Sequence, residues 1–277
     1  PAGFVKFEGP YPYYANKALK FENDQDIADY YLDILQKTIN TEGAHQIAAI
    51  FVETIVGSNG ILIPPKQYLQ GIRKICDETG ILMVCDEVMA GFYRTGKAFA
   101  FHHFDIKPDL VTTAKGATCG YVPLGAVIVS EKVQKFFDTN KMFCGLTYNA
   151  HPMGCAVTVA AIKEYDRLDV PGNVARMGKI LGELLEDLKK KHKCVGDVRY
   201  IGLFSGVELV RAPHVPMVPY GQDPEGLMPK IVGMLKKEGF STYHHESVVI
   251  VAPPLIINEE ELRAAMAILD RVLDSVD

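Results

Sequence analysis

Two charged residues follow apolar runs in a pattern that could do chemistry. Asp86 comes directly after the run 81–85, and Lys115 is the residue after the run 110–114. Continuous apolar runs of this length are typical of strands covered on both faces of a parallel sheet. Ligands of open α/β sheets bind at the carboxyl ends of the strands, so we expect an acid and an amine to meet at that edge.

The residues around Lys115 favour a reactive amine over a solvated one. Ala114, Gly116 and Ala117 leave room for a planar ligand and offer no neighbouring carboxylate. A partly desolvated amine is a good carbonyl nucleophile, because burial disfavours its charged form. Pyridoxal phosphate needs a Lys amine for its aldehyde and a carboxylate that keeps its ring nitrogen protonated. Taken singly, Asp86 would be typical of a helix cap and Lys115 of a surface group, but the pair favours a cofactor site.

Two longer segments carry a resemblance to a known family. Residues 85–96 (CDEVMAGFYRTG) and 108–116 (PDLVTTAKG) resemble the signature of class III aminotransferases, which are pyridoxal-phosphate enzymes of fold type I. The spacing between Asp86 and Lys115 also resembles that of the family, and the similarity extends over most of the chain. Further matching positions are Gly120, the segment 123–127 (PLGAV) and the segment 147–152 (TYNAHP).

This resemblance implies a role for each of four residues. Lys115 would form the Schiff base with the cofactor and, once displaced by the substrate amine, act as the general base. Asp86 would pair with the pyridinium nitrogen, and Val88 would lie against one face of the ring. Thr147 would reach the phosphate of the neighbouring subunit, which implies a homodimer with its active site at the subunit interface.

The turn after a strand expected over 46–52 bears on the substrates. In the resembled family, members that accept 2-oxoglutarate tend to carry a Glu where this chain has Ser58, whereas members that use pyruvate tend to carry a small residue. Ser58 therefore favours ping-pong transfer from an ω-amine or ω-amino acid to a small oxo acid such as pyruvate. Ser58 is equally compatible with a plain turn residue, and Glu53 with either a site-shaping residue or a cap.

Two features leave alternatives open. The family usually supplies an Arg that clamps the substrate carboxylate shortly before the position of residues 253–254, and no Arg stands there in this chain. The Gly/Ser-rich phosphate loop of the family is also absent, so we expect the chain to lack the N-terminal part of such enzymes. A pyridoxal-phosphate mutase or racemase of the same fold, or an inactive truncated form, is the alternative to a transaminase.

The order of elements predicts two domains. Residues 1–165 are expected to form the C-terminal portion of a large α/β, cofactor-binding domain, with a mostly parallel sheet and flanking helices. Residues 166–277 are expected to form a smaller α+β domain that caps the substrate. Helices are predicted over 24–40, 65–78, 131–137, 151–165, 173–193, 225–238 and from 259 onward, and an aromatic loop over 11–14.

Composition excludes several other classes of protein. The formal net charge of −5 offers no basic field for nucleic acid, and no run approaches the roughly 20 apolar residues of a membrane span. The adjacent His pairs do not suit a metal, so no metal site is expected. None of the six cysteines forms a C-x-x-C pair, which predicts reduced, buried thiols and a cytoplasmic location.

Overall fold

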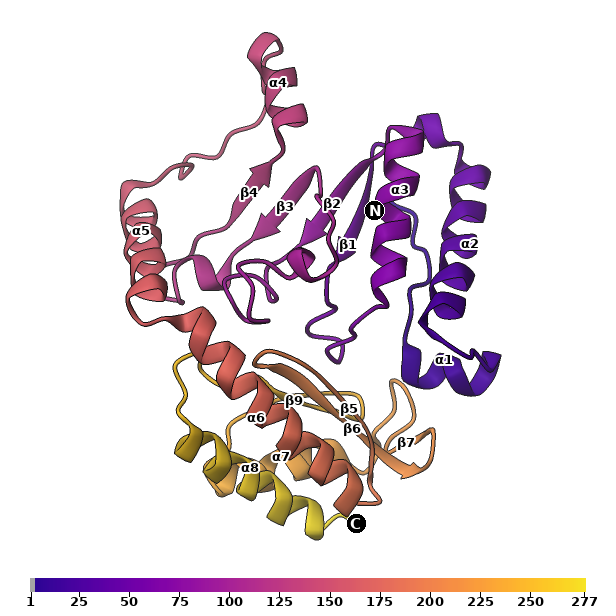
Figure 1. The fold of residues 1–277 in the computed structure, drawn as a ribbon, viewed down its shortest axis with the longest axis vertical. Coiled ribbons are helices and arrows are strands. Elements are labelled where there is room, and N and C mark those ends of the chain that lie inside the picture. The colour runs from indigo at the N-terminus through magenta and orange to yellow at the C-terminus, as the bar shows by residue number, and fades with distance from the viewer. Residues whose placement is uncertain (1–2) are drawn as a thin grey trace. The chain divides into compact units, whose positions relative to one another are not determined.

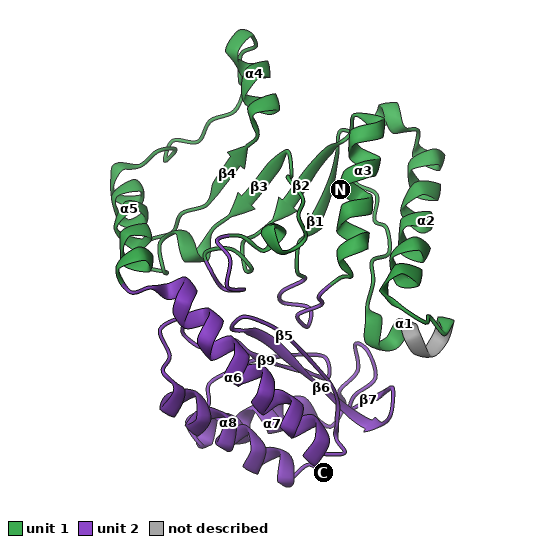
Figure 2. Cartoon of the chain, in the orientation of Figure 1, with its two compact units in different colours: residues 1–55, 64–92, 99–167 green, residues 56–63, 93–98, 168–277 purple. Residues whose placement is uncertain are grey.

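Two compact units make up the chain, as Figure 2 shows: unit 1 comprises residues 1–55, 64–92 and 99–167, and unit 2 comprises residues 56–63, 93–98 and 168–277. The computed structural model describes residues 3–277, apart from the side chains of residues 15–18. The cofactor-binding and substrate-capping roles given to residues 1–165 and 166–277 stay predictions.

Unit 1 is built on a four-stranded sheet (Figure 1). Its strands lie in the order β1 (Ala49–Glu53), β2 (Leu82–Asp86), β3 (Leu110–Thr113) and β4 (Ala126–Val129). The first three are parallel, and β4 runs antiparallel beside β3. The register pairs Glu53 with Asp86 and Asp86 with Thr112, so the carboxyl ends of β1 and β2 lie level with each other.

The helices of unit 1 begin and end where local chemistry dictates. They are α1 (Pro12–Leu19), α2 (Asp24–Glu42), α3 (Lys66–Thr79), α4 (Glu131–Thr139) and α5 (Pro152–Arg167), with short 3₁₀ turns η1 (Ala44–Gln46), η2 (Ala100–His103) and η3 (Lys115–Ala117). The Asn23 side chain caps α2, and Gly80 ends α3 with a left-handed φ of 78°. A Cβ on Gly71 would lie 2.2 Å from Leu32, so this glycine allows α3 to approach α2 closely.

Unit 2 is a smaller α+β assembly with an antiparallel sheet. Its strands are β5 (Val195–Ile201), β6 (Phe204–Ala212), β9 (Val248–Val251) and β8 (His244–His245) in that order, and β7 (Val215–Pro216) pairs with β6. Its helices are α6 (Val170–Lys191), α7 (Leu227–Lys237) and α8 (Glu259–Asp274). Helix α6 packs on β5 and α8, and α7 packs on α8. Asn258 and Glu261 form a capping box at the start of α8.

Two segments from the first half of the chain belong to unit 2. Residues 56–63 form a loop closed by a bridge between Val56 and Leu62, and residues 93–98 form the second segment. Gly202, at φ 58°, lies so close to the backbone of Thr95 that a Cβ would come within 2.5 Å of it. The 93–98 segment is therefore held by a close backbone contact that only the tertiary structure reveals.

Several local predictions were wrong. Residues 11–14 are not a loop, because Pro12 starts α1, where its missing N–H costs nothing. All six cysteines are free, but Cys119, Cys144 and Cys155 are exposed rather than buried.

None of the helices in the described part of the chain combines the length and apolar character that a bilayer crossing requires.

Candidate active site

The predicted acid and amine lie at the carboxyl edge of the unit 1 sheet. Asp86 is the last residue of β2, and Lys115 opens η3 two residues after β3 ends at Thr113. Strands β2 and β3 are parallel neighbours, so both residues leave the sheet at the same edge. Strand β2 is buried and apolar until its last residue, so its one charged side chain lies at the carboxyl end.

Asp86 is fixed by a short local contact. Its Oδ1 accepts a hydrogen bond of 2.8 Å from the backbone N–H of Val88. Within the described residues, its other carboxylate oxygen has no hydrogen bond, and the side chain is half-buried. Thr112 lies beside Asp86 in the β2–β3 register. The turn after β2 therefore orients this carboxylate and leaves one of its oxygens able to accept a hydrogen bond.

Lys115 has an unusual backbone conformation. Its φ of 37° lies in the left-handed region, which is uncommon for a residue with a side chain, although ten other described non-glycine residues also have a positive φ. Its ammonium makes no hydrogen bond or ion pair with any residue that the structure describes. The expectation of a partly desolvated amine was wrong: Lys115 is exposed, because Ala114, Gly116 and Ala117 are too small to cover it.

Glu87 is a buried acid that the sequence did not single out. Its side chain is fully buried, and its two carboxylate oxygens each accept a hydrogen bond of 2.8 Å from the backbone, at Ala100 and Phe101. Burial raises the pKa of Glu87, and these backbone donors act against that shift. Its own N–H donates to the carbonyl of Thr112, which continues the β2–β3 ladder beyond Asp86. Glu87 therefore fixes the start of η2 next to the site.

The other predicted residues lie on different elements of the chain. Val88 is half-buried in the turn after Asp86, and Glu53 is exposed at the end of β1, level with Asp86. Thr147 is exposed in a turn of unit 1 that precedes α5. Ser58 is exposed in the 56–63 loop, which belongs to unit 2.

These residues fit the needs of pyridoxal phosphate. An accessible amine at Lys115 can react with an aldehyde, and the uncommitted oxygen of Asp86 can accept a hydrogen bond from a protonated ring nitrogen. The small side chain of Ala114 and the absence of one at Gly116 leave the amine uncovered. In the described part of the chain, no group of three or more His, Cys, Asp or Glu side chains could hold a metal ion.

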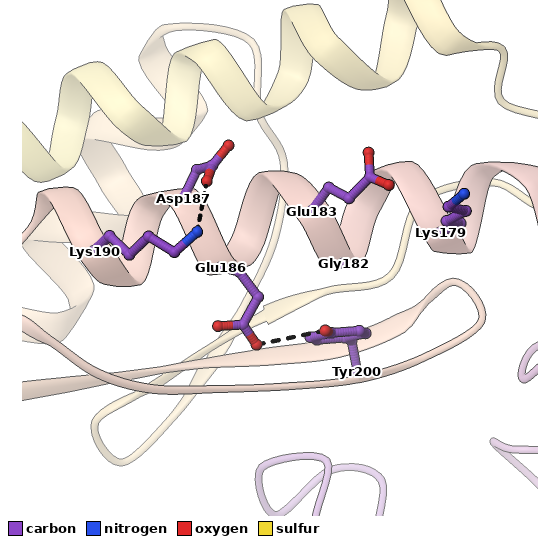
Figure 3. Close-up of a pocket in the computed structure, with 7 residues that line it drawn as sticks. All are labelled: Lys179, Gly182, Glu183, Glu186, Asp187, Lys190 and Tyr200. Carbon is purple, nitrogen blue, oxygen red and sulfur yellow. Dashed lines mark hydrogen bonds and ion pairs between the residues drawn. The ribbon is translucent and has the colours of Figure 1, made fainter.

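A surface hollow elsewhere in the chain does not compete with this site. It lies along α6 in unit 2 (Figure 3), and three of its charged side chains have partners within the hollow. The Tyr200 hydroxyl lies 3.4 Å from Glu186, and Lys190 lies 3.2 Å from Asp187. None of the predicted site residues lines it, and we interpret it as the solvated face of a helix. The residues that line it are Lys179, Gly182, Glu183, Glu186, Asp187, Lys190 and Tyr200.

Comparison with curated proteins gives relatives of one chemical class. The chain is 36% identical over 228 residues to a taurine–pyruvate aminotransferase of Bilophila wadsworthia, covering 79% of this chain and 49% of the relative. It is 39% identical over 189 residues to an omega-aminotransferase of Caulobacter vibrioides, covering 66% of this chain and 43% of the relative. The chain thus spans about half the length of the curated relatives it matches.

Comparison with solved structures and with family models agrees. A taurine:2-oxoglutarate aminotransferase from Bifidobacterium kashiwanohense, solved with PLP and glutamate, matches with a TM-score of 0.95 and 44% identity, over 100% of this chain and 62% of that one. An (S)-enantioselective omega-transaminase from Thermomicrobium roseum matches with a TM-score of 0.91 and 32% identity, over 100% of this chain and 61% of that one. The predicted α/β transaminase fold is confirmed. The family model "Aminotransferase class-III" matches residues 3–273, and the chain belongs to that family.

Proposed function

We propose that this chain carries the reactive lysine and the ring-nitrogen acid of a pyridoxal-phosphate aminotransferase. The observation that supports this most directly is the placement of Asp86 and Lys115 at one edge of two adjacent parallel strands. Both residues lie in the segment matched by the class III family model. The reaction is amino-group transfer in two half-reactions, first from a donor amine and then to an oxo acid.

Each residue then has a defined task. Bound pyridoxal phosphate supplies a sink for the electrons of the C–H bond broken at the donor carbon. Lys115 holds the cofactor through Nζ and, when released as a free amine, accepts the proton from that carbon and returns it. The Asp86 carboxylate accepts a charge-assisted hydrogen bond that keeps the ring nitrogen protonated. Val88 packs against a ring face.

The substrate class follows from the loop that contains Ser58. We assign the donor to ω-amines and ω-amino acids and the acceptor to a small oxo acid such as pyruvate. A small residue at Ser58, in an exposed turn, supports a compact acceptor, and two of the relatives are named for taurine as donor. One of these two is named for pyruvate and the other for 2-oxoglutarate, so the acceptor is measured with both.

A homodimer is part of the proposal. Thr147 would complete the phosphate site of a second subunit. Its neighbours Leu146 and Tyr148 are large apolar residues that are exposed in unit 1, as is Phe143. Exposed apolar residues concentrated in this way are typical of an interface. Sedimentation velocity should therefore give twice the mass of the 30.6 kDa chain. The six free thiols support a cytoplasmic location.

Covalent capture of the cofactor tests the function. The chain is incubated with pyridoxal phosphate and reduced with borohydride, and the modified residue is identified by mass spectrometry. We expect modification at Lys115, none there in Lys115→Arg, and normal modification in the matched surface control Lys107→Arg. With taurine as donor, we then compare the rate of alanine formation from pyruvate with the rate of glutamate formation from 2-oxoglutarate.

The two proposed roles give different variants different outcomes. Lys115→Arg should lower transfer by at least about 100-fold, because it removes the amine that moves the proton. Asp86→Asn should still be modified at Lys115 but transfer at least roughly tenfold more slowly, because a neutral amide cannot stabilise a positive ring nitrogen. Capture at another lysine, or transfer that survives in Lys115→Arg, would refute the proposal.

A further inference from the structure

A tyrosine on α5 makes a hydrogen bond to the turn that carries Lys115. Tyr165, on α5 and almost fully buried, donates a hydrogen bond of 2.7 Å from its hydroxyl to the carbonyl of Gly116. The same hydroxyl lies 3.1 Å from Sγ of Cys119. Tyr165 therefore contacts both sides of the short turn that begins at Lys115.

The turn needs such a contact because its own bonds are few. Ala117 N–H donates to Ala114 O at 2.9 Å, and Thr118 N–H donates to Lys115 O at 3.2 Å. Lys115 itself has a φ of 37°, a left-handed conformation that is strained for a residue with a side chain and is held by its surroundings.

A second contact fixes the same residue from the other direction. A Cβ on Gly116 would lie 2.5 Å from Cβ of Phe92, so only glycine fits there. The rings of Phe92 and Tyr165 lie 6.1 Å apart at 31°, which places both around Gly116. With Phe92 against its Cα and Tyr165 on its carbonyl, the peptide that follows Lys115 has little freedom.

We propose that Tyr165 is a positioning residue that holds the Lys115 turn in its left-handed conformation through the carbonyl of Gly116, so that the amine is presented for reaction with the cofactor aldehyde. This rests on the proposed function, since it assigns Lys115 as the reacting amine. In that reaction Nζ bonds to the aldehyde carbon and the aldehyde oxygen leaves as water. Borohydride then delivers hydride to the C=N bond and leaves a stable secondary amine at Nζ.

The first test needs no cofactor. Tyr165→Phe keeps the ring beside Phe92 and removes only the hydroxyl. Hydrogen exchange at the amides of Ala117 and Thr118 should become roughly 3- to 10-fold faster, the range that the loss of one neutral hydrogen bond allows. Amides of β2 that exchange by local fluctuation should keep the wild-type rate, and the urea midpoint should fall by no more than the loss of this one hydrogen bond accounts for, which separates a local role from a general structural one.

The second test uses the cofactor and two matched controls. The rate of borohydride-trapped modification at Lys115 should fall roughly 3- to 10-fold in Tyr165→Phe. Cys119→Ala keeps the 2.7 Å bond from Tyr165 to Gly116 and removes only a weak 3.9 Å contact from Sγ to the same carbonyl, so it should trap at close to the wild-type rate. Tyr200→Phe, which removes a hydroxyl that binds Glu186 in unit 2, should also leave both measurements unchanged.

The outcomes separate this inference from the function on which it rests. Faster local exchange together with slower trapping supports it. If wild type traps the cofactor and Tyr165→Phe changes neither measurement, or if exchange accelerates throughout the chain, the positioning role is overturned. If wild type does not trap the cofactor at Lys115, the proposed function fails, and the positioning role falls with it.

Discussion

A buried ion pair in unit 2 gives the sharpest stability prediction. Nη2 of Arg199, on β5, lies 3.0 Å from Oε2 of Glu208, on β6, and their side chains are 9% and 2% exposed. Arg199 also donates two hydrogen bonds to the carbonyl of Gly60, at 3.1 and 2.8 Å, and lies 3.3 Å from Asp197. The guanidinium thus links the sheet of unit 2 to the 56–63 loop.

The size of the effect depends on which of the two charges is removed. In Arg199→Met the almost fully buried Glu208 carboxylate loses this cation, and removal of one partner of a buried pair costs about 3–5 kcal/mol. In Glu208→Gln, Arg199 retains Asp197 and the carbonyl of Gly60, so the cost should be only about 1–2 kcal/mol. In the double variant Arg199→Met with Glu208→Leu neither charge of the pair remains and Asp197 keeps Lys189 at 2.9 Å, so about 2 kcal/mol of the loss should return.

Urea unfolding followed by far-UV circular dichroism measures these differences, because the chain has no tryptophan for fluorescence. Urea is uncharged and does not screen ion pairs, unlike guanidinium chloride. An Arg199→Met variant that loses less than about 1 kcal/mol would refute the reasoning, because it would mean that the Glu208 charge is not desolvated. The same conclusion would follow if the double variant were less stable than Arg199→Met.

Two further predictions concern pH and a backbone approach. Burial alone would raise the pKa of Asp109, but hydrogen bonds from a backbone amide and from Arg73 lower it. The ionised Asp109 carboxylate therefore stabilises the folded state fully above its unfolded pKa of about 3.9, and this contribution is lost as pH falls through the lower folded pKa. Below about pH 5 the free energy of unfolding of wild type should therefore fall more steeply with pH than that of Asp109→Asn. Urea titrations at each pH measure the difference. Gly202→Ala should lower the free energy of unfolding by at least about 2 kcal/mol, because the new Cβ would meet the backbone of Thr95. The control Gly80→Ala, at φ 78° but in open space, should lower it by about 1 kcal/mol. Equal losses in the two variants would contradict this reasoning.

Local chemistry made much of the fold predictable. Helix boundaries followed from residues that act on their own neighbours, such as Asn23 as a cap, Pro65 before α3 and Gly80 after it. The apolar runs gave β2 and β3 to within one residue at each end. The sheet-edge rule then placed Asp86 and Lys115 together, because it depends only on strand direction and strand ends.

The rest depends on contacts between residues far apart in sequence. Nothing near Tyr165 indicates that its hydroxyl binds Gly116, and nothing near Glu87 indicates that it accepts hydrogen bonds from Ala100 and Phe101. The exposure of Cys119 was missed for the same reason, since burial is a property of the folded chain. Such residues could be suspected from the sequence only as polar groups within apolar surroundings.

The 56–63 loop after β1 and the Lys115 turn after β3 are stabilised by different contacts. After β1 the chain enters the 56–63 loop, whose Gly60 carbonyl is bound by Arg199 of unit 2. The loop that carries Ser58, the residue we connect with acceptor choice, is therefore bound by Arg199 of β5 through Gly60, whereas the Lys115 turn is bound within unit 1 by Tyr165 through Gly116. Because the two residues depend on separate sets of contacts, substitutions that weaken one set should leave the other intact. Acceptor preference and cofactor capture should accordingly respond to different variants.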